Sequence, residues 1–470
     1  MTENRTYDEI HIGEGASLTR VCSENDLIVF AHASGNLNPL HLPKTDGMPT
    51  EGSETVAPSM WGGSLFSAVL GNVLPGIGSL YRAQSLRFEG RAHVGDELTI
   101  EVVAREKRPD RVVLFDCTLT NQRGERIAYG EAEVIAPAEK LVADVELPEL
   151  FVRPHQHFKR VIDSLAGVAP MKTAVVCPDD DNSLGGALLS YREELIQPVL
   201  VGDEGAIRAA AERIGADLAG IEIINVIEHE EAAARAVALV GEGRAEAIMK
   251  GNIHSDEVLR AVLSKSAGLR TSRRISHCFV LDVPGLDHLL IISDAAINIS
   301  PDLAAKVDIV QNAIDVGIAI GFEKPNVGIL SAVETVNPAI PSTLDAAILS
   351  KMADRGQIHG GVVDGPLAMD NAIDIEAAKT KGIRSLVAGR AEILIVPNLE
   401  AGNMLAKELT FIANADAAGL VVGTKVPVML TSRADDEQAR LASCAIAQLY
   451  AAYLRNGRPL IALPPRAVAA

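Results

Sequence analysis

The hydrophobic pattern along the chain changes once, and this change limits the possible folds more than any other feature. Between about residues 86 and 136, apolar residues alternate with polar ones in successive segments. The apolar residues on one face are Leu98, Ile100, Val102 and Ala104 in one segment, and Val113, Phe115, Cys117 and Leu119 in the next. Alternation with a period of two, interrupted by short polar turns such as "NQRGER", predicts an antiparallel sheet with one covered face.

An apolar stretch rich in small residues, "SMWGGSLFSAVLGNVLPG", precedes the alternating segments. Its length and composition predict one long helix. A buried helix wrapped by an antiparallel sheet is a hot-dog-like arrangement, and we expect it for residues 1–136.

The pattern of apolar residues after about residue 155 is different: short apolar runs end abruptly in polar, glycine or proline residues. Ala-rich helical stretches such as "EEAAARAVALVGEG" lie between these runs. The runs are "KTAVVCPDDD", "AEAIMKGNI", "NVGILSAVE", "GGVVDGP", "AEILIVPNLEAGN" and "VPVMLTSRADD". Buried parallel strands alternating with helices are typical of an α/β sheet, whose ligands bind beyond the carboxyl ends of the strands. We therefore expect an α/β domain over residues 155–470, with its site in the strand-end loops.

The segment between the two rhythms has no clean period and contains Pro137, Pro148 and Pro154. We interpret residues 137–154 as a linker. At 470 residues the chain is long enough for two or three domains, so the sequence predicts an α/β two-domain protein.

Composition excludes several classes of function. The formal net charge of −19 argues against nonspecific binding to nucleic acid or to anionic membranes. The five cysteines are scattered without metal-binding spacing, which predicts reduced thiols and no metal site. The N-terminal residues "MTENRTYDEIHIGEG" lack an apolar core, and no apolar run reaches membrane-spanning length. We therefore expect a soluble, cytoplasmic protein.

The loop in "VPVMLTSRADD" carries the strongest anion-binding signal. Thr431, Ser432 and Arg433 follow a predicted strand directly, and hydroxyls, a guanidinium and free backbone N–H groups suit a phosphate-sized oxyanion. Asp435 and Asp436 would cap the next helix, or one of them would act as a base. A plain helix cap on a surface loop is the alternative.

Two further loops have the composition of ligand sites. In "VPNLEAGNMLAKEL", Asn398 and Asn403 can donate or accept hydrogen bonds, and Gly402 permits close approach to the backbone; a capped helix start would look the same. The arginines of "GLRTSRRISH" would suit the phosphates of a nucleotide-like cofactor such as coenzyme A, although a solvated charged face is a commoner cause of such a cluster.

Several common motifs are missing. Lys250 and Gly251 end a predicted strand, but no GxxxxGK[ST] loop occurs, and no GxGxxG, GxSxG or HExxH pattern is present. We interpret His254 and His277 as packed or surface histidines. Residue-level reasoning therefore indicates an α/β enzyme that binds phosphate-bearing small molecules.

The second half resembles the phosphate acetyltransferase/phosphate butyryltransferase family from about residue 155 to 465. The matching segments are, in order, "MKGNIHSDEVLRAVL", "SDAAINISPD", "AVETVNPAIPSTLDA", "VDGPLAMDNAI", "VPNLEAGNMLAKEL" and "TSRADD". "VETVNP" and "TSRAD" look closer to the butyryl branch. The resemblance implies acyl transfer between coenzyme A and inorganic phosphate, two αβα subdomains with the site between them, no metal and no permanently bound cofactor.

The family's serine–arginine pair falls on Ser432 and Arg433. The aspartate proposed as base for the coenzyme A thiol in the acetyl branch falls near Ala439, so that base is missing, and we take Asp435 as a possible substitute. Candidate substrate-binding residues in the matched loops are Arg270, Thr271, Asn298, Asn398, Gly402, Asn403 and Thr431.

The first half resembles the MaoC-like, R-specific enoyl-CoA hydratases over about residues 5–136. The motif is "FAHASGNLNPLH", where the family has SGDxNPxH with an aspartate and a histidine that activate water. His41 matches the histidine, but Asn36 replaces the aspartate. An amide has no useful basicity near neutral pH, whereas the two side chains have nearly the same shape. The resemblance thus implies a domain that accepts acyl-CoA but hydrates it weakly or not at all.

The sequence favours an acyl-CoA:phosphate acyltransferase fused to a weak or inactive hydratase-like domain. A fully bifunctional hydratase/acyltransferase is the second hypothesis. A third is a noncatalytic module that senses acyl-CoA and oligomerises, and a dehydrogenase of isopropylmalate type is weaker because no metal cluster is evident. Both families form oligomers, so we expect a homo-oligomer.

Overall fold

The computed structural model describes residues 2–42, 55–143, 157–431 and 435–461. The chain separates into two compact units, Met1–Arg153 and Pro154–Ala470, which are described separately. Within the described ranges, no helix is long and apolar enough to cross a membrane.

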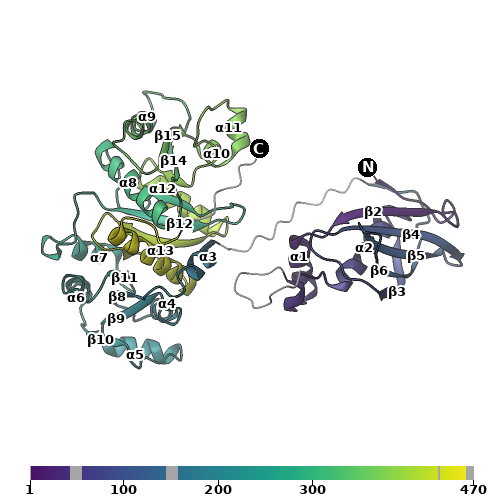
Figure 1. The fold of residues 1–470 in the computed structure, drawn as a ribbon, viewed down its shortest axis with the longest axis horizontal. Helices are drawn as coiled ribbons and strands as arrows, with labels where there is room; N and C mark the ends of the chain where they lie inside the picture. Colours follow the sequence, from purple (N-terminus) through teal and green to yellow (C-terminus); the bar gives the residue numbers. More distant parts are fainter. Residues whose placement is uncertain (1, 43–54, 144–156, 432–434, 462–470) are drawn as a thin grey trace. The chain divides into compact units, whose positions relative to one another are not determined.

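The N-terminal unit is a five-stranded antiparallel sheet around one long helix (Figure 1). The strands, in spatial order, are β2 (Gly15–Val21), β4 (Glu97–Arg108), β5 (Val112–Asn121), β6 (Arg126–Ile135) and β3 (Leu80–Phe88). Helix α2 (Ser59–Asn72) buries Trp61, Leu65, Phe66 and Val69 against the sheet. All eight side chains predicted to lie on the covered face are buried, so the hot-dog fold is confirmed.

Short elements complete this unit. They are α1 (Glu24–Ser34), the 3₁₀ turn η1 (Pro39–His41), β1 (Thr2–Glu3) and β7 (Val142–Ala143). Strand β1 pairs with β7, and Asn4 Nδ2 donates to the carbonyl of Glu139 at 3.0 Å. The first residues of the segment expected to be a linker are therefore part of the N-terminal unit.

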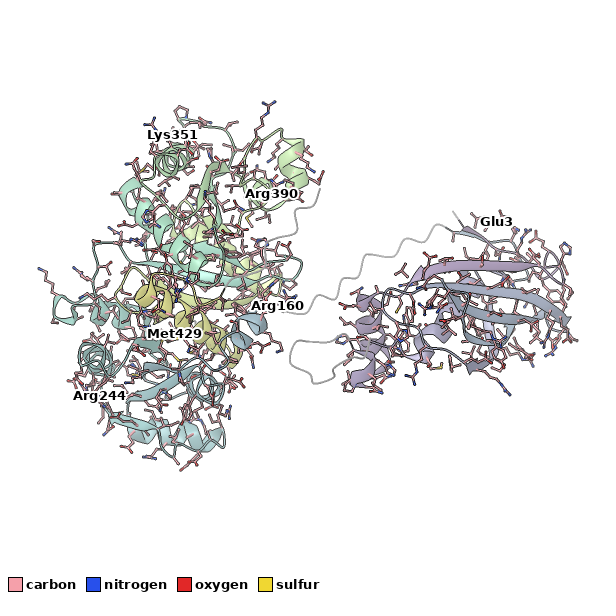
Figure 2. All side chains as sticks on the ribbon, in the orientation of Figure 1. Glu3, Arg160, Arg244, Lys351, Arg390 and Met429 are labelled. Atoms are coloured by element: carbon pink, nitrogen blue, oxygen red, sulfur yellow. The ribbon has the colours of Figure 1, made fainter. Side chains whose placement is uncertain are left out.

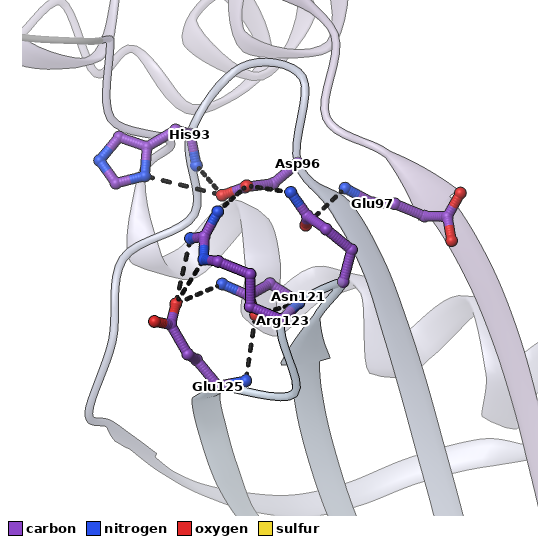
Figure 3. Close-up of polar contacts among 7 residues, drawn as sticks. His93, Asp96, Glu97, Asn121, Arg123 and Glu125 are labelled. Atoms are coloured by element: carbon purple, nitrogen blue, oxygen red, sulfur yellow. Dashed lines mark hydrogen bonds and ion pairs between the residues drawn. The ribbon is translucent and has the colours of Figure 1, made fainter.

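A polar cluster holds the β5–β6 turn to the loop before β4 (Figure 3). The carboxylate of Asp96 accepts hydrogen bonds from the His93 backbone N–H at 2.9 Å, Gln122 Nε2 at 2.9 Å and Arg123 Nη1 at 3.4 Å. Within the turn, Glu125 accepts from Asn121 Nδ2 at 2.7 Å. These bonds fix one end of the sheet, where two loops meet.

The C-terminal unit contains an eleven-stranded sheet made of two parallel groups and an antiparallel centre. The first group is β10 (Glu222–Asn225), β9 (Ile196–Gly202), β8 (Met171–Val176), β11 (Ala247–Lys250) and β18 (Val428–Met429). The centre is β17 (Asp416–Val422) and β12 (Ser276–Asp282), and the second group is β13 (Leu290–Ser293), β16 (Ile393–Ile395), β14 (Asn326–Leu330) and β15 (Val362–Leu367).

All six predicted strands are present, and they lie in the two parallel groups. The antiparallel centre was not predicted. Strand β17 runs antiparallel to both β18 and β12, and β12 runs antiparallel to β13. The two parallel groups therefore run in opposite directions, and each forms the sheet of one αβα subdomain.

Helices cover the two faces differently. One continuous core spans both groups under α3 (His157–Asp163), α4 (Asp181–Arg192), α5 (Glu204–Arg213), α8 (Leu303–Ala319), α9 (Pro341–Asp354) and α13 (Glu437–Asn456). On the other face there are two separate cores. The first contains α6 (His229–Gly241), α7 (Ser255–Val262) and the turn η2 (Lys265–Ala267), and the second contains α10 (Met369–Ile373), α11 (Ile375–Thr380) and α12 (Leu399–Phe411). The division between these two cores marks the subdomain boundary.

Candidate active site

The carboxyl ends of the two parallel groups approach each other at the antiparallel centre. The register runs level across four strands, through Met429, Leu420, Cys278 and Ser293. Thr431 follows two residues after Met429, which is labelled in Figure 2, and Asp294 follows Ser293 directly. Because strands of opposite direction end at nearly the same level, loops from both subdomains meet in the middle of the sheet.

The loop after β13, residues 294–298, crosses from one subdomain core to the other. Ala295 belongs to the core under α12, whereas Ile297 packs against the core under α7. The buried carboxylate of Asp294 holds the loop by accepting from the backbone N–H groups of His277, Ala296, Ile297 and Asn298 at 2.9–3.2 Å. It also accepts from Asn298 Nδ2. A carboxylate with this many donors fixes the loop more firmly than neutral hydrogen bonds would.

A cavity of about 920 Å³ lies on one side of this loop. Its walls are residues 270–275, residues 297–302 and the first turn of α8. Arg274 Nε donates to Asn298 Oδ1 at 2.6 Å, so a cation is fixed against the loop. Arg273 pairs with Asp315, and although burial acts against the charged form, this carboxylate raises the pKa of Arg273. Arg270 is exposed at the same wall.

A second cavity, of about 450 Å³, lies on the other side. Ala296 lines it, while its neighbour Ile297 lines the first cavity, so one loop borders both. The buried Lys250 contributes its ammonium group, which donates to the carbonyl oxygens of Gly251 at 3.3 Å and Thr431 at 3.4 Å. The N-terminus of α7 and its N-cap residue, His254, also line this cavity. Both volumes are in the range of small-molecule sites.

Arg440, on α13, links the carboxyl end of β11 to the residues that follow β18. Its Nη1 donates to the carbonyl of Lys250 at 3.2 Å and to Thr431 Oγ1 at 2.7 Å. Burial lowers the pKa of Arg440, while the nearby carboxylates of Asp180, Asp435 and Asp436 oppose that shift. Gly186 on α4 makes room for it, because a Cβ there would lie 2.5 Å from Arg440 Cδ.

The site residues predicted from the sequence of the C-terminal unit lie in several different places. Arg270, Thr271 and Asn298 line the larger cavity, and Thr431 lines the smaller one. Ser432 and Arg433 lie outside the described residues. Asp435 directly precedes Asp436, whose carboxylate caps α13 by accepting from the Ala439 N–H at 2.9 Å.

The residues of the α12 loop support the 294–298 loop. Asn398 caps α12 by accepting from the Ala401 N–H at 2.9 Å, and Asn403 Nδ2 donates to the Ala295 carbonyl at 3.3 Å. A Cβ at Gly402 would lie 2.8 Å from the Asp294 carbonyl oxygen. The close neighbour of Gly402 is thus the protein's own loop, where we expected a ligand, and neither cavity includes these three residues in its walls.

Sequence reasoning missed Asp294 and Arg440. Asp294 lies in the quoted segment "SDAAINISPD", and an aspartate directly before small residues at a strand end is a signal for a carboxylate-capped loop. Arg440 gave no signal, because the sequence does not show that a charged residue of an amphipathic helix points inward.

In the N-terminal unit, His41 Nδ1 lies 2.8 Å from the carbonyl oxygen of Val56. This contact favours the tautomer with the proton on Nδ1, which leaves Nε2 able to accept a proton. Asn36 Oδ1 accepts from the Asn38 backbone N–H at 3.2 Å, and Asn38 in turn caps the turn that carries His41. The two motif residues are thus on one compact loop. Among the described residues, no group of three or more His, Cys, Asp or Glu side chains could hold a metal ion.

The C-terminal unit is similar in sequence and structure to known proteins. The family model described as phosphate acetyl/butaryl transferase matches residues 228–448. A phosphate acetyltransferase of Rhizobium meliloti is 59% identical over 298 residues, which cover 63% of this chain and 94% of the relative. The solved branched-chain phosphotransacylase from Enterococcus faecalis V583 is 29% identical with a TM-score of 0.53, over 60% of this chain and 99% of that one.

A solved structure also matches part of this chain at lower structural similarity: the unliganded R-hydratase PhaJ1 from Pseudomonas aeruginosa is 38% identical, with a TM-score of 0.31, over 32% of this chain and 99% of that one. The relative from Rhizobium meliloti is matched over nearly its whole length at high identity. The chain therefore belongs to the phosphate acetyl/butyryl transferase family of acyltransferases.

Proposed function

We propose that the C-terminal unit moves a short-chain acyl group between coenzyme A and inorganic phosphate: acyl-CoA + phosphate ⇌ acyl phosphate + CoA. The observation that carries this proposal is the pair of cavities that share the 294–298 loop, each with a fixed cation at its wall. Two anionic substrates must be held side by side for direct transfer, and two adjoining basic cavities meet that need.

The arginine-lined cavity suits the nucleotide end of coenzyme A, because guanidinium groups bind phosphates well. Arg270, Thr271 and Asn298 would contact this end. The smaller cavity, with Lys250 and Thr431, suits the reacting groups. Ser432 and Arg433 follow Thr431 in the chain, and we assign them to binding phosphate and stabilising the carbonyl oxyanion.

The relatives differ in acyl chain, since one is named a phosphate acetyltransferase and another a branched-chain phosphotransacylase. The motifs "VETVNP" and "TSRAD" favour the butyryl branch. Phosphate-dependent release of coenzyme A, measured with a series from acetyl-CoA to hexanoyl-CoA, tests the activity and ranks the chains. If the thioester is lost at the same rate whether or not phosphate or arsenate is present, the proposal is wrong.

For the N-terminal unit we propose an enoyl-CoA hydratase-like site of low activity. His41 keeps the form of a general base, because its Nδ1 faces the Val56 carbonyl and leaves Nε2 for water. Asn36 supplies an acceptor to the loop but no proton acceptor for catalysis. A fully bifunctional enzyme is the second candidate, favoured by the orientation of His41, and the rate of crotonyl-CoA hydration separates the two.

We further propose that residues 1–136 and 155–470 are the two functional domains of a cytoplasmic homo-oligomer. The homo-oligomer is supported by β3, an edge strand that exposes Leu80, Tyr81 and Phe88. An exposed apolar edge strand is a ready surface for pairing with a second copy. Analytical ultracentrifugation tests this, and a monomer at micromolar concentration would contradict it.

A further inference from the structure

The acyl transfer proposed above requires a group that takes the proton of the coenzyme A thiol. A cysteine thiol has a pKa of about 8.5 and is only a few per cent thiolate at neutral pH, and the alkyl thiol of coenzyme A is likewise almost fully protonated there. Ala439 stands where the resemblance implies a base, and the carboxylate of Asp436 is used to cap α13. The base must therefore be Asp435, the substitute named from the sequence, or a residue at another position.

Three side chains that can titrate line the smaller cavity within the described structure: Lys250, His254 and Asp256. A lysine ammonium has donors but no acceptor, and Lys250 donates to the carbonyl of Thr431. Asp256 is paired with Arg260 at 3.2 Å, and that arginine also pairs with Glu230. That carboxylate therefore has Arg260 as a partner in an exposed ion pair.

His254 is placed by the backbone at the entrance to α7. Its N–H donates to Glu257 Oε2 at 3.1 Å, and its carbonyl accepts from the Glu257 N–H at 3.2 Å. These reciprocal bonds fix the backbone of His254 at the first turn of α7, and Lys250, Ala296 and Thr431 line the same cavity. A neutral imidazole has one ring nitrogen that can accept a proton, which is what a base for a thiol requires.

We propose that His254 is the catalytic residue that accepts the proton of the coenzyme A thiol in the 450 Å³ cavity. This inference rests on the proposed acyl transfer and adds a role to it. When acyl-CoA forms, the sulfur attacks the carbonyl carbon of the acyl phosphate while an imidazole nitrogen of His254 takes the thiol proton. The carbonyl carbon–oxygen bond to phosphate then breaks, and the electron pair leaves with inorganic phosphate.

The reverse direction balances in the same way. A phosphate oxygen attacks the thioester carbonyl, the carbon–sulfur bond breaks, and the departing thiolate takes the proton from the imidazolium of His254. Lys250, whose ammonium lies in the same wall, would offset the negative charge of the two anions in either direction.

The test compares wild type, H254Q, H254A and H229Q in the direction that forms acyl-CoA, between about pH 5.5 and 9. His229 is exposed at the start of α6 and lies outside both cavity walls, so H229Q is the matched control. We expect H254Q to lower kcat about 10²–10⁴-fold with little change in KM for coenzyme A. Its rate should rise about tenfold per pH unit up to the pKa of the thiol itself. Added imidazole should restore part of the activity of H254A, and H229Q should behave as wild type.

Other results would overturn the inference in distinguishable ways. Wild-type kcat in H254Q, or a reduced kcat with an unchanged pH profile and no rescue of H254A by imidazole, would show that His254 is not the base. A change of pH profile in D256N or in D435N, with an unchanged profile in H254Q, would assign the role to that aspartate instead. Absence of phosphate-dependent turnover in the wild type would overturn the proposed function and this inference together. Circular dichroism and thermal midpoints of all variants identify any loss caused by misfolding.

Discussion

At the scale of single residues, the two candidate sites differ in what their side chains can do. Asn36 forms the same short-range hydrogen bond, from its Oδ1 to the Asn38 N–H, that an aspartate oxygen would form. The loop therefore keeps its shape without a base. In the C-terminal unit, by contrast, charged side chains such as Asp294 and Arg440 are buried and hold loops through hydrogen bonds.

The Asn36→Asp substitution should restore a base beside His41 without altering the loop. We expect crotonyl-CoA hydration to increase by about 10²–10⁴-fold, the usual contribution of general acid–base catalysis. Loss of crotonyl-CoA absorbance measures the rate, and the double variant with His41→Ala should lose the gain. If Asn36→Asp gains no activity, the account of a lost base is wrong.

Asp294→Asn tests whether the carboxylate holds the loop between the two cavities. An amide nitrogen would face the N–H and Nδ2 of Asn298, which now donate to Oδ2. We expect unfolding free energy to fall by about 1–3 kcal/mol, the cost of unsatisfied buried donors, and KM for coenzyme A to rise. Asp203→Asn is the control, because Asp203 only caps α5 and asparagine caps equally well. Unchanged stability and KM in Asp294→Asn would contradict this role.

The residue scale also shows why part of the site was not predictable. Loop composition selected Arg270, Thr271, Asn298 and Thr431 as candidates for substrate binding, and each of them lines one of the two cavities. It gave Asn398, Gly402 and Asn403 the same weight, although Asn398 caps α12 and the other two lie against residues 294–295. Polar residues at strand ends either bind ligands or cap helices, and only the three-dimensional contacts separate these uses.

At the scale of helices and strands, hydrophobic period was a good guide to strand position and a poor guide to strand direction. The alternation predicted β4 and β5 because each has one buried face. Strands β12 and β17 are buried on both faces and antiparallel, and nothing in a short apolar run encodes direction. Direction follows from the connections between strands, which join two opposed parallel groups here.

Gly130 is required by the close approach of β6 to β3. A Cβ at this position would lie 1.9 Å from the carbonyl oxygen of Ser85, which belongs to the facing strand. We expect Gly130→Ala to destabilise the N-terminal unit by about 1–3 kcal/mol through this overlap. Gly71→Ala in α2 is the control: no heavy atom lies within 4 Å of its Cβ, so it should stabilise by about 0.5–1 kcal/mol. Chemical denaturation measures both, and a neutral Gly130→Ala would refute the overlap.

The Asp96 cluster of Figure 3 should make the N-terminal unit sensitive to acid. Burial favours the neutral acid, but hydrogen bonds from the His93 N–H and Gln122 and the charge of Arg123 lower the pKa of Asp96 overall. The folded pKa is below the unfolded value of about 3.9, so the stabilisation is complete above that value and is lost as pH falls through the folded pKa.

Denaturation of wild type and Asp96→Asn at several pH values tests this dependence. We expect Asp96→Asn to cost about 1–3 kcal/mol near neutral pH, where the carboxylate is ionised, and less below about pH 3. Asp116→Asn is the control, since Asp116 is exposed and pairs with Arg105 on the surface, where such pairs contribute little. A cost for Asp96→Asn that does not change with pH would show that the charge is unimportant.

At the scale of the whole molecule, the two units have separate cores. One core contains residues between Ile10 and Ala136, and the other cores contain residues from Phe158 onward. The change in hydrophobic pattern predicts two units, because the sheet of each pattern must be covered by its own set of apolar residues. We therefore expect residues 154–470 expressed alone to retain the kcat of the transferase. Loss of folding or turnover in that fragment would show that the N-terminal unit stabilises the other.

The most direct test of the account is the dependence of coenzyme A release on phosphate. The purified full-length protein is incubated with acetyl-CoA, butyryl-CoA and hexanoyl-CoA, with and without phosphate, and free thiol is measured. We expect release only when phosphate or arsenate is present, with acyl phosphate as the product when phosphate is supplied. Tight acyl-CoA binding without phosphate-dependent turnover would contradict it and would favour a noncatalytic acyl-CoA-sensing module.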